Sequence, residues 1–156
     1  MASVQLCPPV QGQVLVDLAM KPPADGDPSY PLYKKEVDGI YESLQRRAKR
    51  LVAALNTLEG VTCNAAQGAM YLFPQIRFSI KALEAAKAQG KTPDAFYCMA
   101  LLNATGVCVV PGSGFCQKEG TWHFRSTFLP PEAQLDGFIQ RIQVFHQDFC
   151  DTYRDE

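Results

Sequence analysis

A long amphipathic pattern over residues 30–59 places the strongest constraint on how this chain can fold. Apolar residues recur there at spacings of three and four, which is the period of one helix face. They are Tyr33, Val37, Ile40, Leu44, Ala48, Leu51, Leu55 and Leu58. Ser29 and Pro31 are typical of a helix start, and Gly60 is typical of a helix end. Such a helix would be about 45 Å long, so we predict that it protrudes from its domain or connects two bodies.

The remaining pattern predicts short strands mixed with helices. Strands are predicted at 61–64, 69–73, 107–110 and 121–128, and helices at 79–89, 92–106 and 130–149. This order predicts an α+β fold, in which a small sheet of about four short strands packs against helices. The run 107–110 is continuously apolar, so we expect both of its faces to be buried. We expect the Thr92 hydroxyl to cap the helix that follows it, with Asp94 near the positive helix end.

The N-terminal segment differs from the rest in composition. Residues 6–13 are turn-rich because proline fixes φ and lacks a hydrogen-bond donor. Residues 14–20 form an apolar run whose secondary structure the pattern leaves open. Residues 21–29 hold three prolines, one glycine and two aspartates, which is typical of a loop or linker.

Composition and charge exclude several classes of function. The 156 residues are 47% hydrophobic and 20% charged, which fits one globular domain. Net charge is -1, and the single basic run, at residues 46–50, lies in a helical pattern. We therefore expect a solvated helix face and no nucleic-acid binding. No apolar run approaches the roughly 20 residues of a membrane-spanning helix, and no secretory signal pattern is present.

The cysteines predict a reducing compartment. Six cysteines occur without a C-x-x-C pair, and only two histidines accompany them, so zinc-type spacing is absent. Cys63, Cys98 and Cys108 lie inside apolar runs. We predict buried, reduced thiols in an intracellular protein, in the cytoplasm or an organelle.

The predicted strand 121–128 carries the chemically most informative residue. Side chains alternate along a strand. One face holds Trp122, Phe124, Ser126 and Phe128, and the other holds His123, Arg125 and Thr127. A guanidinium can bind a carboxylate through two parallel hydrogen bonds, which makes Arg125 a candidate carboxylate-binding residue. The alternative is an arginine on the solvent face of an edge strand.

A glycine loop, Gly112-Ser113-Gly114-Phe115, lies before that strand. It lacks the third glycine and the Lys-Ser/Thr ending of phosphate-binding loops, and a strand follows it instead of a helix. The alternatives are a tight turn, or a close backbone approach to a ligand held by the neighbouring strand. His123 has no evident acid or thiol partner, so we predict a packed or surface histidine. His146 lies on the broad apolar stripe predicted for the last helix, so we predict a structural role for it.

Four long segments resemble alanine aminotransferase, a family of fold-type-I enzymes that depend on pyridoxal phosphate. These segments are residues 6–13, 63–71, 106–115 and 123–131. The resemblance covers nearly the whole chain and corresponds to the C-terminal third of the family. It implies interconversion of L-alanine and 2-oxoglutarate with pyruvate and L-glutamate.

The resemblance also implies roles for parts of the chain. Arg125 would bind the α-carboxylate of the substrate, and the loop residues Gly112, Ser113, Gly114 and Phe115 would lie near the substrate entrance. The long helix would connect a large cofactor domain to a small C-terminal domain. Residues 1–28 would form the edge of the large domain, the linker and part of a dimer interface, and residues 29–156 would form the small domain.

The chain departs from the family pattern at three positions. Trp122, Ser126 and Cys116 stand where the family commonly has tyrosine, methionine and glycine, and these changes could alter the amino-acid preference. The family's cofactor-binding lysine and the acid opposite the cofactor ring lie upstream of these segments. We therefore expect the chain alone to be inactive, and the full-length protein to be a homodimer that binds no nucleic acid or membrane.

Two alternatives remain beside this interpretation. One is a glutamate–glyoxylate aminotransferase of the same fold, since the segment carries only the shared α-carboxylate site. The other is a free-standing, non-catalytic binding or dimerisation domain.

Overall fold

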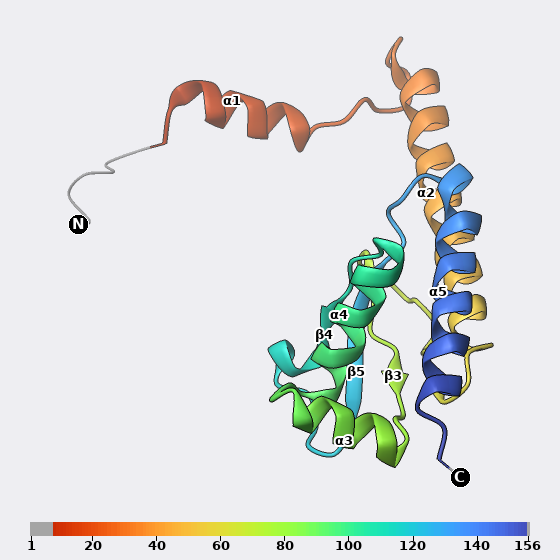
Figure 1. Ribbon diagram of the computed structural model, residues 1–156. Coiled ribbons are helices and arrows are strands. Elements are labelled where there is room, and N and C mark those ends of the chain that lie inside the picture. The colour runs from red at the N-terminus through yellow and green to blue at the C-terminus, as the bar shows by residue number, and fades with distance from the viewer. Residues whose placement is uncertain (1–7, 156) are drawn as a thin grey trace. The chain divides into compact units, whose positions relative to one another are not determined.

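The structure is a computed structural model that describes residues 8–155 (Figure 1). The helices are α1 (Val10–Ala19), α2 (Tyr30–Leu55), α3 (Ile80–Ala88), α4 (Pro93–Thr105) and α5 (Glu132–Thr152), with a 3₁₀ turn, η2, at Gly112–Phe115. The strands are β1 (Val61–Thr62), β2 (Tyr71–Leu72), β3 (Gln75–Ile76), β4 (Val110–Pro111) and β5 (Trp122–Thr127). The chain divides after Tyr41 into two compact units. A boundary between residues 28 and 29 stays a prediction.

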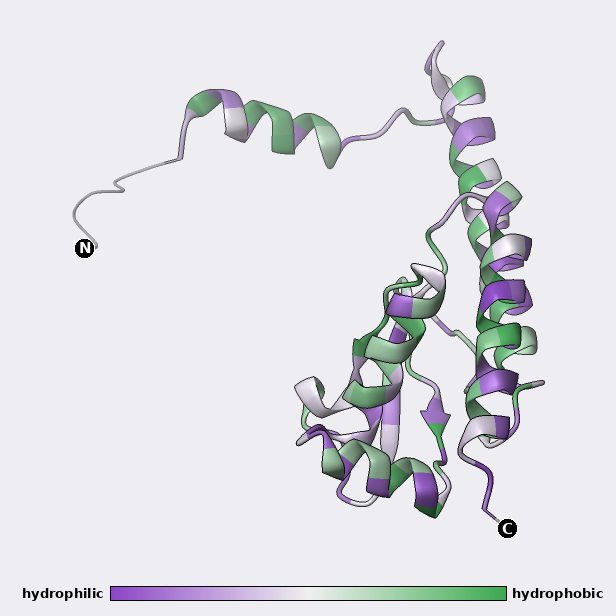
Figure 2. Ribbon diagram, viewed as in Figure 1, coloured by the Kyte–Doolittle hydropathy of each residue, from purple (hydrophilic) through white to green (hydrophobic). Residues whose placement is uncertain are grey.

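In the first unit, α1 buries none of its side chains. Its apolar residues are 52–76% exposed: Val10, Val14, Leu15, Val16 and Leu18, followed by Met20. Figure 2 shows this helix largely in the colour of hydrophobic residues. The apolar run at 14–20 is thus helical as far as Ala19, and the helix also includes residues 10–13, which the sequence had suggested as part of a turn-rich segment. The first part of that turn-rich segment, residues 6 and 7, lies outside the described residues.

The long helix is confirmed, although it ends at Leu55 instead of Glu59. Asn56 explains this end, because its amide group acts like a second peptide unit. It accepts from the Cys63 amide nitrogen and donates to the Cys63 carbonyl, both at 2.9 Å. These bonds draw the chain out of α2 and into β1. Gly60 adopts a left-handed conformation, with φ of 69°, in the intervening turn.

Strand β5 is the centre of the sheet in the second unit. Tyr71 lies opposite Thr127 and Gln75 lies opposite His123, so β2 and β3 keep one antiparallel register along β5. Strand β4 pairs with the other edge of β5, with Val110 opposite Arg125. Strand β1 pairs with β3 and completes the sheet.

One strand was missed in the sequence. The pattern indicated that the strand at 69–73 ends near Pro74, because proline cannot donate a ladder hydrogen bond. The ladder is interrupted there, but Pro74 still accepts from the Phe124 amide nitrogen at 3.2 Å, and pairing resumes at Gln75. The α+β fold is confirmed, and the sheet has this one strand beyond the four predicted segments.

Two local predictions are wrong. In the run 107–110, Val107 and Val109 are buried but Cys108 is exposed, so the run is not buried on both faces. This segment pairs only with β5, and only from Val110 onward, so alternate side chains reach solvent. Thr92 makes no capping bond to α4. Its hydroxyl oxygen lies 3.4 Å from that of Ser113.

The core of the second unit forms where α4 and α5 pack together and α4 covers β4 and β5. Tyr97 of α4 is fully buried, and its ring contacts those of Phe124, Phe145 and Phe149. The predicted apolar stripe of the last helix is confirmed, because Leu135, Ile142, Phe145 and Phe149 are buried. Cys63 and Cys98 are buried free thiols, as predicted, whereas Cys108, for which burial was also predicted, is exposed.

Candidate functional site

Arg125 lies in a central strand, which rules out the edge-strand alternative. Residues of β5 pair with β2 and β3 along one edge and with β4 along the other. The predicted alternation is also confirmed, because Phe124 and Ser126 are buried while Arg125 is half-buried on the opposite face. Strand β5 is therefore held along both of its edges, and Arg125 itself pairs with Val110 of β4.

Two aromatic rings hold the guanidinium group of Arg125. Its central carbon lies 4.5 Å from the centre of the Tyr71 ring and 4.7 Å from the centre of the Phe115 ring. Cation–π contacts of this kind attract a guanidinium without using its N–H donors. Across residues 8–155, no carboxylate or carbonyl oxygen forms an ion pair or hydrogen bond with the Arg125 side chain. Tyr71 and Phe115 are 46% and 41% exposed, so the guanidinium group between them is accessible to solvent.

The glycine loop forms the η2 turn, and its residues have different surroundings. A Cβ atom on Gly112 would lie 2.8 Å from Cβ of His123, so this position needs glycine for close packing on β5. Gly114 has no such neighbour. Ser113 donates its backbone N–H to Asp94 at 2.6 Å. Of the four predicted loop residues, Phe115 is the one whose side chain the structure brings to Arg125.

Asp94 is a residue of this region that the sequence did not single out. Its side chain is 1% exposed and accepts hydrogen bonds from the Ser113 and Ala95 amide nitrogens and from Nε2 of Gln117. Burial opposes ionisation, but hydrogen bonds from Thr92, Ser113 and Ala95 outweigh it and hold the pKa of Asp94 below its ordinary value. The sequence signal was only an acid in the first turn of α4.

Of the two positions predicted for His123, packed or at the surface, the structure shows the packed one, and the residue joins Asp94 to the aromatic residues. Its Nδ1 lies 3.0 Å from Oε1 of Gln117, and its ring stacks on Phe73 with centroids 4.8 Å apart. Phe73 in turn meets Phe115 edge-to-face at 5.9 Å. Burial lowers the pKa of His123, against the opposing influence of the Asp94 charge. The neutral ring is therefore favoured in this position.

Backbone strain is concentrated beside the two rings that hold Arg125. Within residues 8–155, the non-glycine residues with positive φ are Ala69, at 57°, and Cys116, at 52°. Ala69 precedes Tyr71 by two residues, and Cys116 directly follows Phe115. Left-handed conformations are unfavourable for residues with a Cβ atom and often accompany functional sites. The resemblance places a glycine at the position of Cys116, and glycine adopts this conformation without a Cβ penalty.

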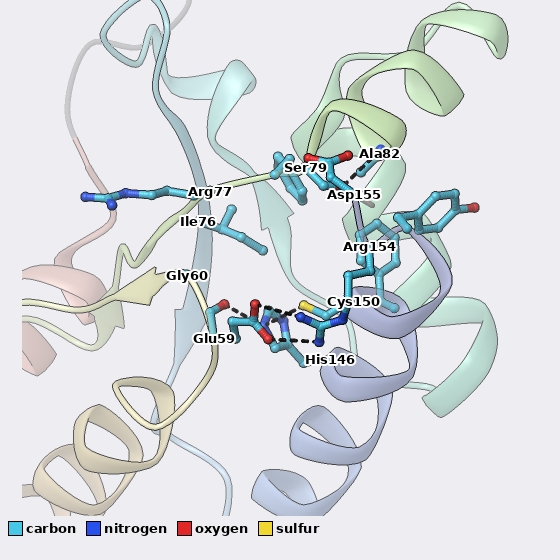
Figure 3. A pocket seen from close by; sticks show the side chains of 13 residues that line it. Glu59, Gly60, Ile76, Arg77, Ser79, Ala82, His146, Cys150, Arg154 and Asp155 are labelled. Atoms are coloured by element: carbon cyan, nitrogen blue, oxygen red, sulfur yellow. Dashed lines mark hydrogen bonds and ion pairs between the residues drawn. The ribbon is translucent and has the colours of Figure 1, made fainter.

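His146 has a structural role, as predicted. It is buried on α5, with Nδ1 3.0 Å from the Tyr97 hydroxyl and Nε2 2.8 Å from the carbonyl oxygen of Glu59. It lines a cavity of about 370 Å³ together with Cys150 and Arg154 (Figure 3). Burial lowers the pKa of His146, because the charged ring would lose its hydration.

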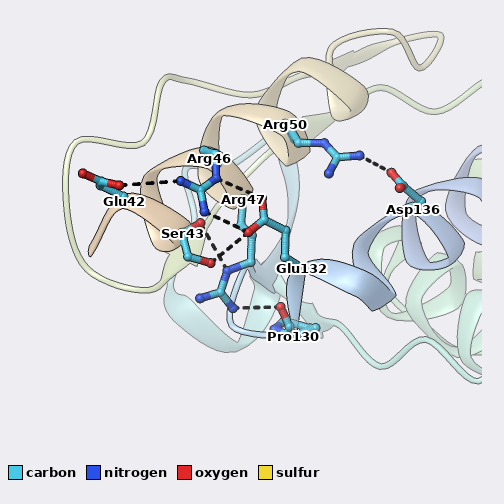
Figure 4. A network of polar contacts seen from close by, with 8 residues as sticks. All are labelled: Glu42, Ser43, Arg46, Arg47, Arg50, Pro130, Glu132 and Asp136. Atoms are coloured by element: carbon cyan, nitrogen blue, oxygen red, sulfur yellow. Dashed lines mark hydrogen bonds and ion pairs between the residues drawn. The ribbon is translucent and has the colours of Figure 1, made fainter. Parts of the chain in front are cut away.

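Away from this site, a group of three arginines on α2 contacts the start of α5 (Figure 4). Arg46 pairs with Glu132 at 3.1 Å, and Arg50 pairs with Asp136. Arg47 donates to the carbonyl oxygens of Leu129 and Pro130, at 2.7 and 2.8 Å. These carbonyls, acids and arginines are called the α2–α5 seam below. The expected solvated face is confirmed for Arg46 and Arg50, but Arg47 is half-buried.

Comparison with known proteins identifies the family. The sequence profile described as "Aminotransferase class I and II" matches residues 9–142. The chain therefore belongs to the class I and II aminotransferases.

Within that family, the chain is similar to alanine aminotransferases. It is 60% identical over 154 residues to a probable mitochondrial alanine aminotransferase of Dictyostelium discoideum, and 58% identical over 154 residues to alanine aminotransferase 2, mitochondrial, of Arabidopsis thaliana. Each alignment covers 99% of this chain but only 29% and 28% of the relatives. The chain thus spans under a third of the length of these relatives.

The fold agrees with this assignment. The structure of an aspartate aminotransferase from Rhizobium meliloti matches with a TM-score of 0.67 and 26% identity, over 94% of this chain and 33% of that one. No helix in the described part of the chain is long and apolar enough to span a membrane. In the same residues, no group of three or more histidine, cysteine or acidic side chains could hold a metal ion.

Proposed function

We propose that this chain is the substrate-carboxylate-binding part of a transaminase that interconverts L-alanine and 2-oxoglutarate with pyruvate and L-glutamate. One observation carries the proposal: the Arg125 guanidinium is held by Tyr71 and Phe115, while its hydrogen-bond donors remain available to a ligand. The high identity to alanine aminotransferases over 99% of the chain supports the choice of substrates.

Arg125 suits this reaction because every substrate in it carries a carboxylate next to the reacting carbon. Two parallel N–H···O bonds would fix both the position and the plane of that carboxylate. The flanking rings keep the guanidinium plane in place, so little side-chain freedom is lost when the substrate binds. Gly112, Ser113, Gly114 and Phe115 would border the entrance, with Phe115 contributing its ring directly.

The residues of this chain do not suit attachment of the cofactor. Pyridoxal 5′-phosphate supplies the aldehyde that takes up the amino group, and it needs a lysine with a desolvated amine. All of the lysines in the chain are exposed: Lys21, Lys34, Lys35, Lys49, Lys81, Lys87, Lys91 and Lys118. We infer that the lysine lies in another part of the complete protein and that this chain alone is inactive.

The exposed apolar residues of α1 support an assignment of residues 1–28 to the edge of a large cofactor domain and a homodimer interface. An isolated helix with every apolar side chain in water is unfavourable, so another part of the complete protein would cover it.

The relatives include proteins named as mitochondrial. The complete protein would act on amino acids and 2-oxo acids in an organelle or the cytoplasm.

Two measurements test this function. The complete protein, reconstituted with pyridoxal 5′-phosphate, should transaminate L-alanine with 2-oxoglutarate faster than L-glutamate with glyoxylate. The 156-residue chain treated with the cofactor and borohydride should gain no cofactor mass at a specific lysine. Preference for glyoxylate would favour the related aminotransferase, and absence of any transamination would favour a binding or dimerisation domain.

A further inference from the structure

The loop that carries Phe115 is closed by a single buried carboxylate. Asp94 accepts from the Ser113 amide nitrogen at 2.6 Å and from Nε2 of Gln117 at 3.0 Å. These two donors lie on either side of Phe115 in the sequence. Asp94 itself is fixed in the first turn of α4, which packs against β4 and β5. The segment 113–117 is therefore held at both ends by one rigidly placed group, with Phe115 in its middle.

A second chain of contacts runs from the same carboxylate to the same ring. Because the Gln117 amide nitrogen donates to Asp94, its oxygen faces Nδ1 of His123 and accepts the proton there. His123 stacks on Phe73, and Phe73 supports the edge of the Phe115 ring. The loop hydrogen bonds to Asp94 and the side-chain contacts through His123 and Phe73 both hold Phe115, the residue that covers Arg125.

A helix cap alone does not explain the surroundings of Asp94. At the start of α4, Asp94 accepts from the Ala95 amide nitrogen, at 3.0 Å, and from the side chain of the N-cap residue Thr92. The bonds from Ser113 and Gln117 come from the loop, and both end on the same oxygen, Oδ2. Burying a carboxylate is costly unless its partners are fixed. Here two of the fixed partners, Ser113 and Gln117, belong to the loop that covers the arginine.

We propose that Asp94 is a positioning residue for Arg125, which fixes Phe115 against the guanidinium without touching the substrate. This inference rests on the proposed function, because it assigns to Asp94 a part in the binding of the substrate carboxylate. Without the Asp94 carboxylate, the loop would loosen and Phe115 would lose its contact with the guanidinium. The Arg125 side chain would then have to become ordered each time a substrate binds.

Steady-state kinetics of the complete enzyme test this role. Asp94→Ala should raise KM for L-alanine about fivefold, the scale of one cation–π contact, with kcat changed less than twofold. Asp94→Asn keeps an oxygen at the position of Oδ2 and should give an intermediate KM. The control is Asp155→Ala, because Asp155 also accepts from two backbone amides, those of Ile80 and Lys81, but away from the loop. This control should leave KM unchanged.

A double-mutant cycle separates positioning from a general structural effect. If Asp94 acts through Phe115, then Asp94→Ala combined with Phe115→Leu should raise KM about as much as Phe115→Leu alone. Independent effects would multiply, to about twenty-five-fold if each is fivefold. Multiplied effects, or an unchanged KM in folded Asp94→Ala, would overturn the proposal.

A spectroscopic measurement keeps this inference separate from the proposed function. In the 156-residue chain, ring currents from Tyr71 and Phe115 should shift the Nε–H proton of Arg125 upfield. Asp94→Ala and Phe115→Leu should lose the same part of this shift, whether or not the complete protein is a transaminase. If Asp94→Ala does not fold, Gln117→Leu removes the second loop attachment and should lose part of the shift. An unaltered shift in these variants would refute the positioning role.

Discussion

Arginines serve opposite purposes in two regions of this molecule. In the α2–α5 seam, Arg46, Arg47 and Arg50 all have protein partners, either acids or backbone carbonyls. At the candidate site, Arg125 contacts aromatic rings instead, and no acid of the described residues pairs with it. An arginine supplied with acceptors stabilises the fold. An arginine held in place without acceptors fits the proposed role, in which a substrate supplies the acceptor.

Backbone strain follows the same division. Ala69 and Cys116, the non-glycine residues with left-handed backbones in the described part of the chain, flank the rings at Arg125. No residue of the seam is among them. The seam can therefore be expected to control stability, while the site sacrifices some stability to hold its arginine.

The sharpest test of this contrast is Arg125→Gln in the complete enzyme. We expect KM for L-alanine to rise about a hundredfold, because losing two hydrogen bonds between charged groups removes about 3 kcal/mol. The free energy of unfolding should fall by only about 1 kcal/mol, since two solvent-accessible cation–π contacts are lost but no hydrogen bond to a protein acceptor. The matched control is Arg77→Gln, an exposed arginine beside β3, which should leave both quantities unchanged. An unaltered KM in Arg125→Gln would contradict the assignment of the site.

The reverse result is expected in the seam. Arg47→Met should lower the free energy of unfolding by about 2 kcal/mol, because the carbonyls of Leu129 and Pro130 lose a charged donor. Arg46→Met should cost less, since its pairing with Glu132 is exposed to solvent. Urea unfolding of each variant measures both losses. Equal losses would show that the half-buried arginine has no special part in the seam.

His146, in the C-terminal half of α5, makes the free energy of unfolding depend on pH. Its pKa is lowered in the folded chain, from an ordinary value of 6.5, so the unfolded chain binds the proton more readily. The stability contribution is therefore complete above pH 6.5 and is lost as pH falls through the folded pKa. Unfolding free energies measured between pH 7 and 5 should decline, and His146→Gln should flatten most of that decline. His123, whose pKa is also lowered, accounts for the remainder.

Asp94 and Glu132 do not interfere with this test, because their ordinary pKa values are 3.8 and 4.5 and both are lowered in the folded chain. Their contributions are lost only at more acidic pH. An unchanged slope in His146→Gln would show that another group titrates in this range.

The smallest effect is expected from relieving strain beside Phe115. Cys116→Gly should raise the free energy of unfolding by about 1 kcal/mol, since glycine adopts a left-handed backbone without a Cβ penalty. Gly114→Ala, at an open position of the same loop, is a control with no steric conflict. Thermal unfolding resolves the difference, and a destabilised Cys116→Gly would mean that the thiol contributes more than the strain costs.

The sequence by itself determined the features that depend on near neighbours in the chain. Apolar spacing predicted α2 and the buried stripe of α5, and strand alternation predicted that Arg125 and His123 share a face. The resemblance of four segments located the family, which the comparison confirmed. Each of these signals is local, because helix and strand periods repeat within a few residues.

Only the tertiary structure decided which residues surround Arg125. Pairing across Pro74 brings Tyr71 to the guanidinium, and no local rule predicts that the register continues beyond a proline. Asp94 looked like an ordinary helix-start acid, and its hydrogen bonds to Ser113 and Gln117 join segments about twenty residues apart. Burial and pairing between distant segments depend on the packing of the whole unit. The sequence therefore predicted Arg125 as the candidate residue, but only the tertiary structure showed which side chains surround it.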